Sequence, residues 1–477
     1  MKNSSTDGSR TDGRAPELGE GGALPDTAAS ALAEAADLAG LAASSVSAWD
    51  ALRDALPDTH PAPGESLPVF AWESPEGESF AALGVADEWH GDGSPAFGEA
   101  RAGVGRMLVS AAPGWERSPG DAGASRALPV AFGAFPFAGR EGPRAGFAAA
   151  RFFLPLRAWH VTPDGRASEW IAPRREKPRA EEPGSGADAA AGSGSGSAAA
   201  TPAGAPGGSL QHGAWVKAVR ATLDAIEAGR VEKVVLARSI ELESSRPIDP
   251  VRMFEALRSG QPGTYRFLLR DAAGHAFVGA SPERLVRLAG GAAHSEAVAG
   301  TIRRGGDAGE DARLGARLLA SDKDRREHAA VAREIQDALA LLCDRIEVDP
   351  EPHLLGLRHL HHLRTLLRAV PRPDTHVFEL LDRLHPTPAV AGVPRAAALD
   401  WIRRTEPCSR GWYSGPVGWV NGAGEGDFAV GIRSATLHGR RARVFAGAGI
   451  VAGSDPEAEW VETELKMRSM RDVLADA

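Results

Sequence analysis

One internal segment, residues 183–209, limits what this chain can fold into more than any other feature of the sequence. It contains only Pro, Gly, Ser, Ala, Asp and Thr, so it offers no large apolar side chain to a hydrophobic core. We interpret residues 173–212 as a flexible linker that carries no catalytic group. A packed fold must therefore be built from the residues on either side of it.

The residues before the linker predict half of a domain. Residues 1–25 are poor in branched aliphatic and aromatic side chains, so we expect them to be disordered. The Ala- and Leu-rich stretch Asp26–Leu56 predicts a helix. Between residues 68 and 172, apolar runs alternate with turn residues and predict antiparallel strands in LPVFAW, FAALGVA, LPVAFGAF and ARFFLPLRAWHV. We thus treat residues 26–172 as the N-terminal half of the fold.

The residues after the linker, 213–477, mix helices and strands. Trp215, Val219 and Leu223 recur at helical spacing, and residues 309–346 show one long helical pattern that no proline interrupts. TYRFLLRDA and HAFVGAS predict paired strands, while GPVGWVN and FAVGIRSATLHG predict a hairpin around the Gly-rich turn GAGEGD. Because strict β-α-β alternation is missing, the pattern favours an α+β architecture.

Composition and charge exclude several classes of protein. The chain has 54 Lys and Arg against 63 Asp and Glu, and this net charge of −9 argues against a nucleic-acid surface or a polybasic membrane anchor. Its two cysteines, Cys343 and Cys408, cannot build a disulfide framework or a Cys-rich zinc site. The sequence has no apolar run long enough for a membrane span, and its first residues lack the apolar core of a secretion signal. We therefore expect a soluble, cytoplasmic protein.

Two residues are candidates for acid–base chemistry. Lys233 begins an apolar strand in VEKVVLAR, and Glu283 follows another apolar strand in GASPERL. A lysine at such a place is more often a solvated strand end, and a carboxyl in a Ser-Pro-Glu turn commonly just starts the next element. Apolar walls around them would favour their neutral forms, which could act as a general base and a general acid.

Carboxylates in two predicted helices could bind a cation. Glu327 lies in the densely charged segment SDKDRREHAAVAREI. Glu459, Glu462 and Lys466 are spaced i, i+3 and i+7, so they project from one side of a helix. Two carboxylates on one helical face suit Mg²⁺, which prefers oxygen ligands, although such a pattern is more often a salt-bridged surface.

Three further residues could contact an anionic ligand. Gly447 and Gly449 in FAGAGIV do not complete a dinucleotide-binding fingerprint, but they would let the backbone approach a ligand oxyanion closely. Arg433 in GIRSATL lies on the preceding predicted strand and could bind a carboxylate through two hydrogen bonds.

Taken together and in this order, these motifs resemble the chorismate-utilising enzyme family, and within it the isochorismate synthases. The resemblance covers residues 213–473, and residues 68–172 match the family's divergent N-terminal half more loosely. It implies a single large α+β domain, built as a layered β-sandwich with helices packed outside. The matching stretches are KVVLAR, GASPE, AGTIRR, LLASDKDRREH, LHPTPAVAG, WYSGPVGW, IRSATL, FAGAGIV and EWVETELK.

The resemblance also implies an activity and a set of residue roles. Chorismate would be converted to isochorismate, with Lys233 activating the water that attacks ring carbon C2 and Glu283 protonating the departing C4 hydroxyl. Glu327 and Glu462 would hold Mg²⁺, and Glu459 would act through metal-bound water. The residues that would surround the substrate are Gly300, Thr301, His385, Tyr413, Arg433, Gly447, Gly449 and Lys466.

Residues that differ from those of the family's other branches exclude several of the family's other activities. Ala299 stands where the aminodeoxychorismate branch has a nucleophilic lysine, which excludes that covalent chemistry. Lys233 argues against the ammonia-using branches, so we expect no amidotransferase subunit and a monomer or homodimer. RGWYSGPVGW resembles the menaquinone-pathway enzymes. Salicylate synthase, which adds pyruvate elimination, and a siderophore-pathway isochorismate synthase remain alternatives, and a non-catalytic chorismate-binding protein is disfavoured because all the implied catalytic residues are present.

One segment, RHLHHLRT, is richer in histidine than the family pattern. His362 and Thr365 fit the family's register. We interpret His359 and His361 as surface or core histidines, because Mg²⁺ prefers oxygen ligands to imidazole.

Overall fold

The computed structural model describes residues 47–56, 67–91, 96–112, 116–117, 129–138, 149–172, 211–407 and 409–476. The predicted disordered N-terminus and nearly all of the predicted linker lie outside these ranges, so both stay predictions. Of the helix expected over Asp26–Leu56, the structure describes the last part as α2 (Ala48–Ala55).

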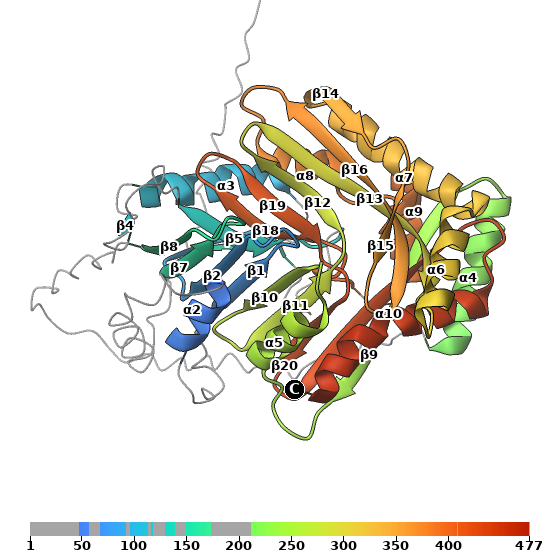
Figure 1. The fold of residues 1–477 in the computed structure, drawn as a ribbon, viewed down its shortest axis with the longest axis horizontal. Coiled ribbons are helices and arrows are strands. Elements are labelled where there is room, and N and C mark those ends of the chain that lie inside the picture. The colour runs from blue at the N-terminus through green and yellow to red at the C-terminus, as the bar shows by residue number, and fades with distance from the viewer. Residues whose placement is uncertain are drawn as a thin grey trace, which may run out of the picture.

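Two large antiparallel sheets dominate the part of the chain that the structure describes (Figure 1). The eleven-stranded sheet has the order β17 (Gly392–Val393), β9 (Lys233–Glu243), β21 (Arg441–Ile450), β20 (Ser434–His438), β11 (His275–Ser281), β10 (Tyr265–Arg270), β1 (Val69–Glu73), β2 (Ser79–Leu83), β7 (Arg157–Val161), β8 (Ala167–Ile171) and β4 (Glu116–Arg117). The ten-stranded sheet has the order β14 (Cys343–Val348), β16 (Leu360–Pro371), β13 (Ala292–Arg303), β12 (Arg284–Ala289), β19 (Gly426–Val430), β18 (Pro416–Asn421), β5 (Val130–Ala134), β6 (Arg151–Leu154) and β3 (Asp87–His90), with β15 (His353–Gly356) paired to β16.

Helices flank these sheets. Figure 1 shows α6, α7, α9 and α10 grouped beside β9 and β13, whereas α2 and α3 lie at the other end of the molecule. Besides α2, the described helices are α3 (Phe97–Ala111), α4 (His212–Glu227), α5 (Pro250–Gly260), α6 (Ala308–Leu319), α7 (Asp322–Ala340), α8 (Val377–Leu384), α9 (Arg395–Thr405) and α10 (Pro456–Asp476). No helix among the described residues is both long and apolar enough to cross a membrane.

Each sheet is built from both parts of the chain: strands from after the linker form one side, strands from before it form the other, and the two sides meet at a single strand pair. β1 pairs with β10 along its whole length, from Val69 opposite Arg270 to Glu73 opposite Arg266. In the other sheet, β5 pairs with β18. Neither sheet is complete without both parts of the chain, and the predicted α+β fold in a single domain is confirmed.

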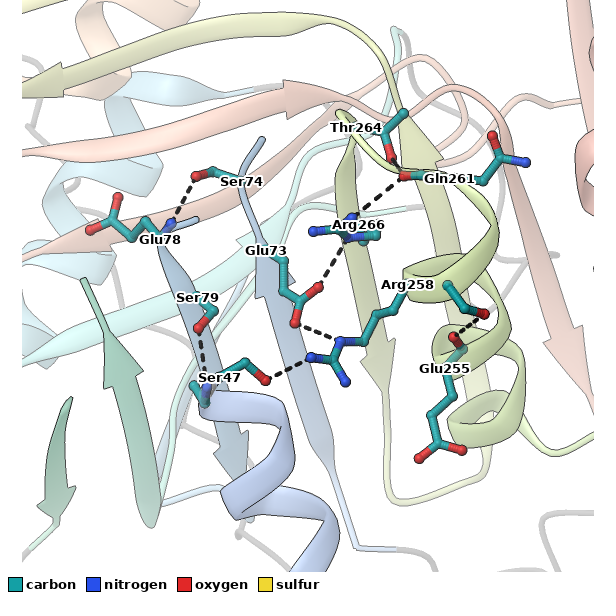
Figure 2. A network of polar contacts seen from close by, with 12 residues as sticks. Ser47, Glu73, Ser74, Glu78, Ser79, Glu255, Arg258, Gln261, Thr264 and Arg266 are labelled. Atoms are coloured by element: carbon teal, nitrogen blue, oxygen red, sulfur yellow. Dashed lines mark hydrogen bonds and ion pairs between the residues drawn. The ribbon is translucent and has the colours of Figure 1, made fainter. Parts of the chain in front are cut away.

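Buried ion pairs reinforce this junction (Figure 2). Glu73 of β1 is only 5 % exposed, and its two carboxylate oxygens lie 2.7 Å from Arg258 Nε and 3.0 Å from Arg266 Nε. Arg258 also donates to Ser47 Oγ, at the N-terminus of α2, at 2.7 Å. Because a buried charge must be paired, these contacts fix α2 and β1 against α5 and β10.

The hydrophobic core lies on both faces of β1, as the alternation of side chains in a strand requires. Phe70 points towards the second sheet, where its ring stacks on Phe132 of β5 with 4.1 Å between centroids. Val69 and Ala71 face the opposite way, into a cluster that α2 and α5 cover with Trp49 and Phe254. One strand thereby contributes to two packing layers.

The expectation of a single helix over residues 309–346 is wrong. The segment forms α6 and α7, separated at Ala320 and Ser321, and ends in β14. Ser321 is the N-cap of α7, since its Oγ accepts a hydrogen bond from the backbone N of Asp324 at 3.3 Å. The signal for this break is local, because Ser321 is followed three residues later by Asp324, a spacing typical of a helix N-terminus.

The segment FAVGIRSATLHG also differs from the single hairpin strand that we expected. The hairpin of β18 and β19 is confirmed, but β19 ends at Val430, and β20 then belongs to the other sheet. The residues between them cross from sheet to sheet, and they carry part of the site described below.

Replacement of Phe132 tests the core between the sheets. Phe132 is fully buried and contacts Phe70 and Phe80 of the opposite sheet. Phe132→Ala should lower the free energy of unfolding in urea by about 3–5 kcal/mol, because it leaves a cavity between the sheets. The control Val109→Ala, at a side chain that is 72 % exposed, should change it by less than about 0.5 kcal/mol. A loss below about 1 kcal/mol for Phe132→Ala would contradict this account of the core.

Candidate active site

Two neighbouring turns carry the chain from one sheet to the other. One connects β11 to β12 and contains Glu283, and the other connects β19 to β20 and contains Arg433. They are hydrogen-bonded to each other, because Val430 N donates to Glu283 O and Ala280 N donates to Arg433 O, each at 3.1 Å. Arg433 has a φ of 52°, in the left-handed region that residues other than glycine rarely adopt. Both turns present their polar residue to one cavity.

This cavity lies where the two turns meet α7 and α10, and it spans about 760 Å³ when the part open to solvent is included. All the residues predicted for the site line the cavity except Glu459 and His385. Those in the wall are Lys233, Glu283, Gly300, Thr301, Glu327, Tyr413, Arg433, Gly447, Gly449, Glu462 and Lys466.

Lys233 and Glu327 form an ion pair across the cavity wall. Lys233 Nζ, at the start of β9, donates to Glu327 Oε1 of α7 at 2.7 Å. Burial alone would raise the pKa of Glu327, but the charge and hydrogen bond of Lys233 hold that pKa below its ordinary value. Gly449 of the adjacent β21 makes room for this pair, since a Cβ there would lie 3.0 Å from Lys233 Cε.

Helix α10 presents Glu462 and Lys466 to the cavity, as their spacing predicts. Lys466 Nζ donates to Glu462 Oε1 at 2.6 Å and to the carbonyl oxygen of Gly447 at 2.9 Å. The helix is held on β9 by Arg238, whose guanidinium lies 3.6 Å from the ring centroid of Trp460. Gly447 lines the cavity, and its carbonyl oxygen already accepts a hydrogen bond from Lys466.

Glu459 lies one turn before Glu462 on α10, outside the cavity wall. Burial and the negative charge of Glu462 raise the pKa of Glu459 to about 7. The two carboxylates thus repel each other across one turn of helix, and a cation bound beside them would relieve that repulsion.

Glu283 is the most strongly perturbed acid of the cavity wall. Its side chain is buried, and this burial, followed by the charge of Glu296, raises the pKa of Glu283 to about 8, although Lys233 and Lys466 act in the opposite direction. A carboxyl with that pKa keeps its proton at neutral pH. Glu283 can therefore donate a proton to a bound ligand.

Arg433 supplies a positive charge that no carboxylate of the described residues pairs with. Its Nη2 lies 3.3 Å from Nε2 of His362, and the other ring nitrogen of His362 lies 3.1 Å from Thr301 Oγ1. Burial, and then the charge of Arg433, lower the pKa of His362 well below its ordinary value, so the ring is neutral. Burial lowers the pKa of Arg433 to about 10, which still leaves the guanidinium charged at neutral pH. It is available to a ligand carboxylate.

The structure places the histidines differently from one another. His362 and Ser414 line the cavity, and the predicted set of site residues contains neither. His362 could have been included, because it fits the family register. His385 is buried elsewhere, at the end of α8, with Nε2 2.8 Å from the carbonyl oxygen of Phe137. We therefore leave His385 out of the substrate contacts proposed below. Outside the cavity wall, His361 Nε2 is 2.9 Å from Asp311 Oδ1.

The donor set fits one kind of metal site. Within the described ranges, no three Asp, Glu, His or Cys side chains gather closely enough to form a complete site on their own. The carboxylates of Glu327 and Glu462 nevertheless both face the cavity. Mg²⁺ often takes only one or two protein carboxylates and fills its other positions with water and substrate oxygens. These residues fit an ion of that kind.

Comparison with known proteins identifies the family of this chain. The sequence model of a family described as "Chorismate binding enzyme" matches residues 61–475, on both sides of the predicted linker. The chain belongs to this chorismate-binding enzyme family. Its membership confirms the resemblance inferred from the motifs.

Named relatives of this chorismate-binding enzyme are isochorismate synthases. It is 46 % identical over 265 residues to the salicylate biosynthesis isochorismate synthase of Pseudomonas aeruginosa, covering 55 % of this chain and 54 % of that protein. It is 39 % identical over 260 residues to isochorismate synthase MenF of Bacillus subtilis, covering 54 % and 55 %. The chain thus spans about half the length of these two relatives. The structure of the menaquinone-specific isochorismate synthase MenF from Escherichia coli superposes with a TM-score of 0.68 at 27 % identity, over 87 % of this chain and 92 % of that one.

The raised pKa of Glu283 predicts a pH-dependent gain in stability on its replacement. The folded protein keeps a proton on Glu283 up to about pH 8, whereas the unfolded chain releases it near the ordinary value of 4.5. Wild-type stability should therefore fall as pH rises between these values, by up to about 1.4 kcal/mol per pH unit from this group. Glu283→Gln removes that loss, so its free energy of unfolding relative to wild type should rise from pH 5 to pH 8.

Urea denaturation of both proteins at several pH values checks this prediction. The matched change Glu99→Gln, at an exposed position of α3, should give a difference from wild type that hardly varies with pH. A flat difference for Glu283→Gln as well would show that Glu283 is ionised in the folded protein.

Proposed function

We propose that the protein is an Mg²⁺-dependent isochorismate synthase, which converts chorismate to isochorismate. The observation that carries this proposal is the pairing, in one cavity, of a protonated carboxyl, Glu283, with an amine, Lys233. An isomerisation that adds a hydroxyl at one ring carbon and removes one from another needs a base and an acid together. The names of the relatives support the same reaction.

The charges of the cavity suit a substrate with two carboxylates. Arg433 is free to bind the enolpyruvyl carboxylate with two hydrogen bonds, and the hydroxyl of Tyr413 lies in the same wall. Glu327 and Glu462 would hold Mg²⁺, which when bound supplies positive charge for the ring carboxylate. Binding is therefore directed by charge to a molecule with separated anionic groups.

The reaction needs an amine without its extra proton and a protonated carboxyl. Lys233, charged in its ion pair with Glu327, first releases one proton to solvent and then takes a proton from a water molecule as the water oxygen bonds to C2. The ring double bonds shift, the C4–O bond breaks, and Glu283 donates its proton so that the hydroxyl leaves as water. One water is consumed and one is released, and a proton passed from Lys233 back to Glu283 restores both groups. Each of them is expected to contribute about 10²–10⁴-fold to the rate.

Three further parts of the proposal concern the pathway, the cellular location and the oligomeric state of the enzyme. We assign it to menaquinone biosynthesis, on the resemblance of RGWYSGPVGW and on its likeness to MenF. The Pseudomonas aeruginosa relative favours salicylate biosynthesis instead. Measurement of menaquinone and salicylate after deletion of the gene in its own host separates the two. We also propose a cytoplasmic monomer or homodimer. We expect no amidotransferase subunit, since Lys233, which the ammonia-using branches lack, lies in the cavity wall.

Incubation of the purified protein with chorismate and Mg²⁺, with and without EDTA, tests the activity itself. Chromatography should show EDTA-sensitive formation of isochorismate until a fixed ratio to chorismate is reached. Salicylate with an equal amount of pyruvate would assign the protein to the salicylate synthases. Chorismate that reacts only after addition of ammonium salts would instead indicate an amination enzyme.

Replacement of the base should remove turnover but not binding. Lys233→Ala is expected to lower kcat by about 10²–10⁴-fold, because Lys466, the other amine in the cavity wall, is bound to Glu462 and to the Gly447 carbonyl. Chorismate binding, measured by calorimetry, should remain detectable through Arg433. The control Lys217→Ala, at an exposed position of α4, should keep wild-type activity. Full activity of Lys233→Ala would refute its role as the base.

Replacement of a proposed metal ligand should change the Mg²⁺ requirement. Glu462→Gln is expected to raise the Mg²⁺ concentration for half-maximal activity by about 10–100-fold, the range typical of changes around metal sites. Glu457→Gln, on the same helix but exposed, is the matched control and should leave the Mg²⁺ titration unchanged. An unchanged titration for Glu462→Gln would remove this residue from the metal ligands.

A further inference from the structure

A second buried carboxyl, Glu296, lies behind the turn that carries Glu283. Glu296 belongs to β13, is 5 % exposed and does not line the cavity. Its Oε1 accepts a hydrogen bond from the backbone N of Arg284, the residue that follows Glu283, at 2.6 Å. On the other side of the same turn, Glu283 N donates to Ser281 Oγ at 3.3 Å. Glu296 thus holds one of the two ends of the turn.

The hydrogen bond to the backbone N of Arg284 does not by itself require a carboxyl group at Glu296. One backbone N–H could be accepted equally well by the amide oxygen of a glutamine, and burying a carboxylate is unfavourable. Burial raises the pKa of Glu296 above its ordinary value, and Arg284 and Arg364 offset this effect only in part. Arg364 Nη1 lies 3.9 Å from Glu296 Oε2 and is the cation that pairs with this carboxyl when it is ionised.

The charged and titratable groups around these two carboxyls come from several elements. Glu283 faces the charges of Glu296 in β13, Lys233 in β9 and Lys466 in α10. Around Glu296 are Arg284 of β12, Arg364 of β16, Glu76 between β1 and β2, and Tyr265 of β10. The two lysines alone would favour the ionised form of Glu283, which could no longer donate a proton.

We propose that Glu296 is a positioning residue for the acid Glu283: it fixes the turn through the N–H of Arg284 and sets the charge that Glu283 faces from outside the cavity. The proposal rests on the isochorismate synthase activity proposed above. Its physical basis is that two like charges in a medium of low dielectric constant disfavour each other, so a carboxylate at Glu296 keeps the proton on Glu283.

The substitution Glu296→Gln separates the two parts of this role, because it keeps a hydrogen-bond acceptor for Arg284 and removes the charge. In the full-length enzyme, the alkaline limb of the kcat–pH profile should move to lower pH by roughly one unit. At pH 9, kcat should then be about tenfold below wild type, while at pH 6 it should change by less than about twofold. KM for chorismate should hardly change, since Glu296 does not contact the cavity.

Two controls separate this role from a general effect on folding. Glu347→Gln, in the exposed part of β14 in the same sheet, should keep the wild-type profile. Circular dichroism and urea denaturation of Glu296→Gln establish that the variant is folded. A wild-type profile in Glu296→Gln would overturn the proposal, and so would a uniform loss of kcat at all pH values, which a purely structural role would give.

A direct titration keeps this inference distinct from the proposed function. Infrared difference spectra between wild type and Glu283→Gln, recorded over a series of pH values, report the protonation of Glu283 without any turnover. The same difference recorded in the Glu296→Gln background should show the carboxyl band disappearing at lower pH. If wild type does not convert chorismate, the proposed function fails, but the infrared shift still decides whether Glu296 controls Glu283.

Discussion

Strand pairing between the two parts of the chain is the interaction on which the rest of this structure depends. β1 is an internal neighbour of β10, and β5 is an internal neighbour of β18, so both sheets need strands from before and after the predicted linker. Only complete sheets can bury the aromatic layer around Phe70 and Phe132. The complete sheets also hold the two crossing turns side by side, and these turns form the centre of the cavity.

Two carboxyl groups of the cavity, Glu327 and Glu283, have opposite protonation states because their neighbours differ. Glu327 is ionised because Lys233 donates to it directly, while Glu283 keeps its proton because it is more deeply buried and faces Glu296. Acid–base catalysis commonly depends on such pairs, in which the surroundings move the two pKa values apart. The lysine that ionises one carboxylate is also the proposed base, so the proposed metal ligand Glu327 and the proposed base share one ion pair.

Local sequence predicted those features that a few neighbouring residues determine. The spacing of Glu462 and Lys466 sufficed to place both on one face of α10, and the motifs sufficed to name eleven of the twenty-two residues in the cavity wall. The crossing of β19 to β20 and the burial of Glu296 behind Glu283 were not predictable, because each depends on how separate strands pack. The cap at Ser321 was a local signal that the sequence interpretation missed, since its partner Asp324 is only three residues away. His385 shows the same limit, since only its contact with Phe137 reveals that it lies outside the cavity.

At position 433, folding stability and the chemistry of the cavity favour different residues. Its φ of 52° is strained by roughly 1–2 kcal/mol for a residue with a side chain, and glycine would remove this strain. Glycine would also remove the guanidinium from the cavity. Laboratory evolution for heat resistance alone should therefore enrich glycine or asparagine at this position, whereas selection for growth that depends on the activity of the protein should retain arginine. The frequency of arginine at position 433 in such populations thus measures how strongly activity, rather than folding, is being selected.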